Sequence, residues 1–118
     1  MDLLNSLRIL GKKLLKDEVY EKVKIEKALN KSLIQLRIIK NKSASRNISG
    51  TENVKELFLE SLNLYIEGTG DFVAFLKDNN KEHISEGLFK AEEADEILAS
   101  IEELILRNKE RFSDISIS

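Results

Sequence analysis

The stretch TENVKELFLESLNLYIEGTGDFVAFLKD, residues 51–78, decides the fold because it holds the clearest helical pattern in the chain. Its seam positions recur at spacings of 4, 3, 4, 3 and 4, the heptad pattern of a helix that packs on other helices. These positions are Phe58, Leu62, Tyr65, Thr69, Phe72 and Leu76. The phase survives the passage through Gly68-Thr69-Gly70, so we predict one continuous helix rather than two short ones. Such a helix would be roughly 40 Å long, which favours an elongated bundle.

A second helix is expected to follow and to complete an acidic helical hairpin over residues 51–110. Asp78-Asn79-Asn80 is a turn signal, since Asn and Asp side chains bond their own backbone and tolerate left-handed conformations. Beyond this turn, apolar residues recur on one wide arc with the period of a helix. The arc comprises Ile84, Leu88, Ala91, Ala94, Leu98, Ile101 and Ile105. Residues 111–118 are expected to fray as a tail.

The N-terminal half is predicted to hold basic helices over residues 2–42, followed by a polar, serine-rich loop over residues 43–50. The leucines of residues 2–16 gather on one arc of an amphipathic helix. Gly11 falls within that arc, where a missing side chain would let another backbone come close. The apolar pattern fails across Lys16-Asp17-Glu18, which indicates a break.

Composition supports the same fold class. The chain has no proline, and 42% of its residues are apolar and 34% charged, as expected for long helices with one apolar and one ionic face. We therefore expect an all-α single domain over residues 1–118, built as an elongated antiparallel bundle of three long helices. A break near residue 17 would raise the number to four. Because the chain has no cysteine, a disulfide framework and a thiolate metal site are excluded.

One predicted helix carries apolar residues on two sides, and this pattern provides a candidate interface. The first stripe consists of Ile25, Leu29, Leu33, Leu36 and Ile39. Four further apolar residues lie on the far side of the same helix: Val19, Val23, Ile34 and Ile38. A helix that is apolar on two sides is usually covered on two sides, either at the centre of a bundle or at a subunit interface. We take these four residues as a candidate interface.

Charge is divided unequally between the two halves of the chain. Residues 1–50 hold 12 Lys or Arg against 5 Asp or Glu, whereas residues 51–118 hold 7 against 16. Such asymmetry can provide a basic arm for an acidic partner, and it can equally allow the two halves to pair with each other.

Residues suited to catalysis or metal binding are sparse. His83 is the single histidine, so a catalytic triad or a histidine-based metal site would have to rely on it alone. Asp78-x-Asn80-x-Glu82 imitates the first ligands of a calcium loop, but the sixth position is His83 instead of glycine. Gly68-x-Gly70 lacks the third glycine and the preceding strand of a dinucleotide fingerprint. We therefore expect no enzyme, no cofactor and no metal site.

These features favour a non-enzymatic helical interaction or regulatory module that binds a protein partner or itself, with a homo-oligomer expected. Two alternatives are a membrane surface held by residues 2–16 and nucleic acid held by lysines of the basic helices. Those lysines are Lys12, Lys13, Lys16, Lys22, Lys24, Lys27 and Lys31. A cytoplasmic location is expected, because basic residues interrupt the first leucines and no apolar run approaches the ~20 residues of a membrane span.

Overall fold

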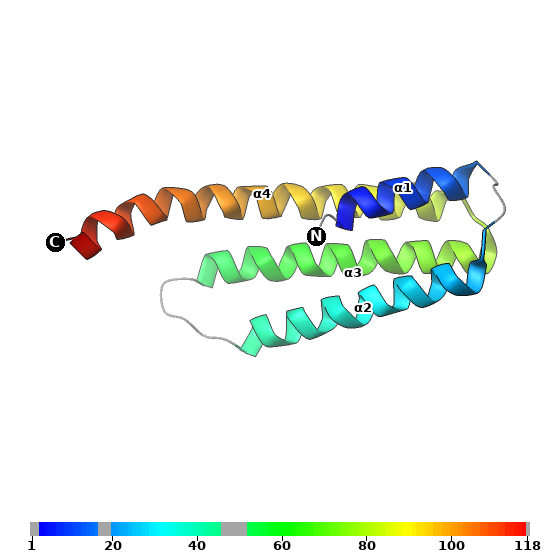
Figure 1. Ribbon diagram of the computed structural model, residues 1–118, viewed down its shortest axis with the longest axis horizontal. Helices are drawn as coiled ribbons and strands as arrows, with labels where there is room; N and C mark the ends of the chain where they lie inside the picture. Colours follow the sequence, from blue (N-terminus) through cyan, green and yellow to red (C-terminus); the bar gives the residue numbers. More distant parts are fainter. Residues whose placement is uncertain (1–2, 17–19, 46–51, 118) are drawn as a thin grey trace.

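The computed structural model describes residues 3–16, 20–45 and 52–117, and all regular structure within them is α-helical. Four helices follow one another along this part of the chain (Figure 1). They are α1 (Leu3–Leu15), α2 (Lys22–Ser45), α3 (Glu52–Asp78) and α4 (Glu82–Ile117). The predicted all-α bundle is therefore confirmed, in its four-helix form, because the first predicted helix ends at Leu15 and a new one begins at Lys22.

Two helix ends differ from the sequence-based boundaries. α2 continues to Ser45, three residues into the segment expected to be a loop, and the remainder of that segment lies outside the described residues. α4 continues as a helix to Ile117, where a frayed tail was expected from residue 111. Neither extension contains a proline or a glycine, the residues that most often stop a helix.

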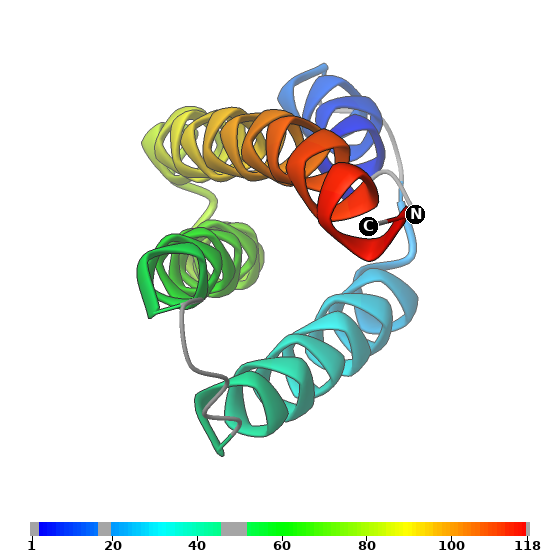
Figure 2. The ribbon, with the colours of Figure 1, turned by 90° about the vertical axis from the view of Figure 1, so that its left-hand side faces the viewer.

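The helices form two layers along a body of 61 × 25 × 19 Å. α1 lies along the first part of α4 in one layer, and α2 lies along α3 in the other, with α3 and α4 joining the layers (Figures 1 and 2). Each basic N-terminal helix therefore lies against a helix of the acidic half. This arrangement favours the second interpretation of the charge asymmetry, in which the two halves pair with each other.

The core follows the heptad seam of α3. Leu62, Tyr65, Thr69, Phe72 and Leu76 are all buried, and Phe72 has no exposed surface. Residues of the other three helices pack against this seam. They belong to the predicted leucine arc of α1, the inner stripe of α2 and the apolar arc of α4. These are Leu4, Leu7, Leu14, Leu29, Leu36, Ile84, Ala91 and Ala94. The pattern of period 3.6 thus identified the buried face of every helix.

The turn between α3 and α4 lies at the predicted Asp78-Asn79-Asn80. Asn79 has a φ of 56°, the left-handed conformation that asparagine tolerates. The Asp78 Oδ1 atom accepts the backbone N–H of Asn80 at 2.9 Å, and Asn80 Oδ1 accepts the N–H of Glu82 at 3.1 Å. The second bond satisfies a free donor at the start of α4. Among the described helices, none combines the length and apolar character required to cross a membrane.

Candidate functional site

The outer face of α2 carries the exposed members of the predicted interface. Val23, Ile34 and Ile38 expose 79%, 57% and 49% of their surface. Val19 lies outside the described residues. The three exposed side chains lie opposite the buried stripe of α2, which includes Leu29 and Leu36, because spacings of 11 and 4 residues return to nearly the same angle on a helix. The structure therefore brings three predicted residues onto one uncovered line.

Two exposed lysines lie on the same line between the apolar residues. Lys27 and Lys31 occupy the turns between Val23 and Ile34. We refer to Val23, Lys27, Lys31, Ile34 and Ile38 as the α2 stripe. A shallow hollow of about 500 Å³ surrounds its N-terminal end and is lined by Val23 with charged neighbours of residues 21–27. The stripe thus offers apolar contact with positive charge in its middle.

Most of the leucine arc of α1 is buried in this fold. Leu4, Leu7 and Leu14 are buried in the core, and the arc packs on α4. Arg8 on the outer side donates a hydrogen bond to Glu92 of α4, with 3.5 Å between Nη2 and Oε1. Exposed ion pairs of this kind contribute about 0 to 1 kcal/mol, so the buried leucines hold α1 in place.

The outer face of α4 forms a second uncovered line that sequence reasoning did not select. Phe89 exposes 61% of its surface and Leu104 38%. Glu93, Glu96 and Ser100 are exposed on the turns between them, and the Ser100 hydroxyl donates to the backbone carbonyl of Glu96 at 3.1 Å. We refer to these five residues as the α4 stripe. An aromatic residue outside the core arc of α4 was the signal that could have identified it.

A cavity of about 400 Å³ opens beyond the N-terminal end of α1. It exists because α1 has 13 residues whereas α2 has 24, so one position of the bundle is only partly filled. Leu36, Leu62 and Tyr65 belong to its apolar lining, and Asp95 and Glu102 contribute carboxylates. The chemistry of this hollow suits an apolar group that carries a cation.

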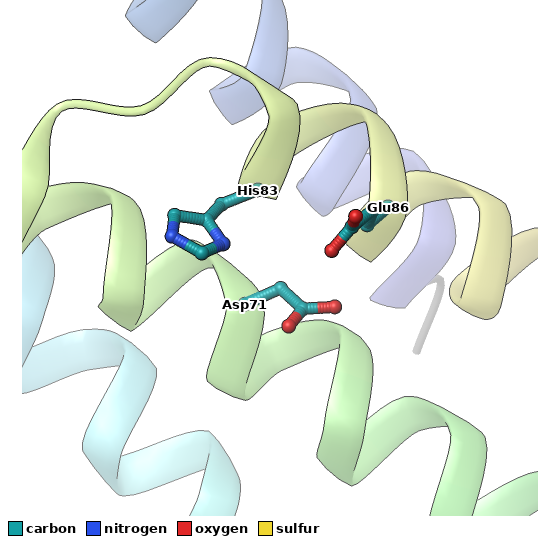
Figure 3. Close-up of side chains that lie close together, drawn as sticks. All are labelled: Asp71, His83 and Glu86. Carbon is teal, nitrogen blue, oxygen red and sulfur yellow. The ribbon is translucent and has the colours of Figure 1, made fainter.

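The single histidine belongs to a cluster that bridges α3 and α4. Asp71, His83 and Glu86 each offer one atom that could bind a metal ion, and these three atoms lie within 4.8 Å of one another (Figure 3). The His83 Nε2 atom is 2.8 Å from Asp78 Oδ2. On the other side of the cluster, the Lys90 ammonium donates to Asp71 Oδ2 at 2.9 Å. A divalent cation at these three donors would have to compete with Lys90 for Asp71.

The pKa values of this cluster follow from its hydrogen bonds. The Asn80 N–H lowers the pKa of Asp78, and the hydrogen bond with His83 lowers it further. The same bond with Asp78 raises the pKa of His83, and the carboxylates of Asp71 and Glu86 act in the same direction. The pKa of Lys90 is raised by its hydrogen bond with Asp71. The cluster is therefore an ion-pair network that ties the start of α4 to the end of α3.

Comparison of the chain with models of protein families, with curated proteins and with solved structures finds no match.

Proposed function

We propose that this protein is a non-enzymatic helical-bundle interaction module that self-associates, with the α2 stripe as its interface. One observation carries the proposal: Val23, Ile34 and Ile38 are exposed on one line of a helix whose opposite face is buried. Apolar side chains gathered on one exposed line commonly mark contact with a protein partner. His83 bonds to Asp78, and Lys90 bonds to Asp71, each between α3 and α4, which is a structural use of these residues.

The size of the stripe sets the strength of the association. Fully burying a valine or isoleucine side chain yields about 1.5 to 3 kcal/mol, and these three residues are already partly covered. Association also costs on the order of 4 to 15 kcal/mol in lost motion. We therefore expect a weak assembly that depends on protein concentration.

Size-exclusion chromatography with light scattering over a range of concentrations tests this proposal. The wild-type protein should exceed its single-chain mass of 13.5 kDa. The double variant Ile34→Gln/Ile38→Gln should remain at the single-chain mass with an unchanged circular dichroism spectrum. Ile9→Gln is a matched control, because Ile9 is 62% exposed on α1 and lies outside the stripe. A wild-type protein that stays at the single-chain mass at every concentration contradicts self-association.

Nucleic-acid binding is a second candidate, favoured by the exposure of Lys24, Lys27 and Lys31 on α2. Lysines neutralise phosphates, so this binding should weaken steeply as salt is added. A labelled oligonucleotide titrated with the protein at low and high salt tests it, with Lys27→Gln/Lys31→Gln as the variant. Binding that is absent at low salt, or that is insensitive to salt, contradicts this candidate.

A further inference from the structure

The lysines of the α2 stripe restrict what can cover it. Two α2 stripes in parallel would bring Lys27 and Lys31 beside their own counterparts. An antiparallel pair would centre on Lys31 of both copies, since that residue lies near the middle of the stripe. Like charges at a contact are destabilising. The stripe therefore requires an apolar surface with negative charge in its middle.

The α4 stripe has this chemistry at the same spacing. Four residues of the α4 stripe each lie 66 positions after a residue of the α2 stripe. In order, Val23, Lys27, Ile34 and Ile38 are followed at this distance by Phe89, Glu93, Ser100 and Leu104. In this parallel register Phe89 corresponds to Val23, Glu93 to Lys27 and Leu104 to Ile38. In the same register Lys31 corresponds to Ile97. Glu96 lies one position before Ile97, on the adjoining part of the exposed face. Apolar residues thus meet at both ends, and opposite charges meet between them.

The topology allows two copies to bring these stripes together. α2 and α4 run in the same direction along the body (Figure 1), and they lie on opposite sides of α3, which contacts both (Figure 2). Each stripe lies opposite its own helix's buried face. If a second copy is displaced sideways with little rotation, its α4 therefore faces the α2 of the first copy. The two helices then run in parallel, as the register requires.

We infer that the α2 stripe of one copy docks in parallel on the α4 stripe of a second copy, with Lys27 beside Glu93 and Lys31 beside Glu96. This inference rests on the proposed self-association and specifies its geometry. The contact is heterologous, because two different surfaces meet, so each added copy leaves one stripe of each kind uncovered. The average mass should then rise with concentration past that of a dimer, and added salt should lower it.

Charge exchange between the two stripes tests this geometry. One full-length variant carries Lys27→Glu/Lys31→Glu, and a second carries Glu93→Lys/Glu96→Lys. All four residues are exposed, so melting followed by circular dichroism should remain near that of the wild type. Each variant alone should stay at the single-chain mass, because its two stripes then have the same sign. An equimolar mixture should recover the wild-type mass, since each variant's α2 stripe then meets the opposite charge on the other's α4 stripe.

Matched controls separate this result from a general effect of net charge. Lys12→Glu/Lys13→Glu on α1 and Glu56→Lys/Glu60→Lys on α3 change the same numbers of charges at exposed positions outside both stripes. Both controls should assemble like the wild type. If Glu93→Lys/Glu96→Lys also assembles like the wild type while Ile34→Gln/Ile38→Gln does not, the α4 stripe is not the occupant and self-association through α2 still stands. If each charge variant alone is single-chain and their mixture remains so, the parallel pairing is also wrong.

Discussion

Gly68 and Gly87 face each other where α3 crosses α4, and each occupies the space that a side chain on the other would require. A Cβ atom built on Gly68 would lie 2.7 Å from the carbonyl oxygen of Gly87, and one on Gly87 would lie 2.7 Å from that of Gly68. Real Cβ atoms do not approach a backbone oxygen so closely. The two helices therefore meet backbone to backbone at this point, which brings the seam of α3 onto α4.

Substituting alanine at this crossing should destabilise the protein. Gly87→Ala would also place its Cβ 2.8 Å from Cδ1 of Phe72, which is fully buried. Overpacking of this kind costs about 1 to 3 kcal/mol, which over most of that range exceeds the ~1 kcal/mol that alanine gains over glycine in a helix. Gly68→Ala should behave in the same way. The free energy of unfolding in urea measures both.

Gly70→Ala provides the control for this prediction. A Cβ on Gly70 meets nothing within 4 Å, so only the gain in helix propensity applies. This variant should be more stable than the wild type by up to about 1 kcal/mol. A Gly87→Ala protein as stable as Gly70→Ala would show that the helices do not approach each other as closely as the structure indicates.

The glycines also show how far the sequence alone could predict the packing. The uninterrupted heptad seam correctly predicted a continuous α3 through Gly68-Thr69-Gly70. It could not distinguish Gly68 from Gly70. Gly68 alone contacts Gly87, which lies 19 positions after Gly68 and on another helix. Gly11 was expected to admit another backbone, whereas a Cβ atom built on it would meet side chains, the Ile84 Cγ2 atom at 3.2 Å and the Leu88 Cδ1 atom at 3.3 Å. The prediction that Gly11 lies at a close contact between helices is confirmed. The prediction that a backbone approaches it is wrong, because side chains do.

The same distinction applies to the candidate site. The period of α2 placed Val23, Ile34 and Ile38 opposite the core, which the structure confirms for these residues. The α4 stripe was missed because its glutamates resemble an ordinary solvated face, and Phe89 acquires significance only when the core side of α4 is known. The His83 network was missed because it joins residues on both sides of a turn, and turn geometry decides which of them meet.

Thr69→Val should stabilise the protein. Thr69 is completely buried on the seam of α3, and its Oγ1 atom has no hydrogen-bond partner among the described residues. An unsatisfied buried hydroxyl costs about 1 to 3 kcal/mol, and valine has nearly the same shape without it. We expect the free energy of unfolding to rise by roughly 1 kcal/mol.

Ser61→Ala is the informative comparison for Thr69→Val. Ser61 is equally buried, but its hydroxyl donates to the carbonyl of Phe58 at 2.7 Å, so its removal deletes a bond that is made. Ser61→Ala should leave stability unchanged or lower it. A Thr69→Val protein that unfolds at lower urea than the wild type would mean that its hydroxyl is satisfied in solution.

The contribution of His83 and Asp78 to stability should depend on pH in a defined direction. The folded state raises the pKa of His83, so its contribution is complete below the ordinary value of 6.5 and is lost as pH rises through the raised value. It lowers the pKa of Asp78, so that contribution is complete above the ordinary value of 3.8 and is lost as pH falls through the lowered value. The pair should therefore stabilise the fold most between these two ordinary values.

Thermal melting of His83→Gln, Asp78→Asn and the double variant checks this dependence. Asparagine keeps an oxygen that can accept the N–H of Asn80, so Asp78→Asn removes the charge while leaving the turn an acceptor. Each single variant should melt further below the wild type at about pH 5 than at about pH 9, because His83 carries its proton only at the lower pH. In the double variant the second substitution should add little, since both substitutions remove the same interaction.

Because Asp71 and Glu86 also face His83, His83→Gln should lose more stability than Asp78→Asn at the lower pH. Equal losses at both pH values would assign the pair a neutral hydrogen bond in place of an ion pair.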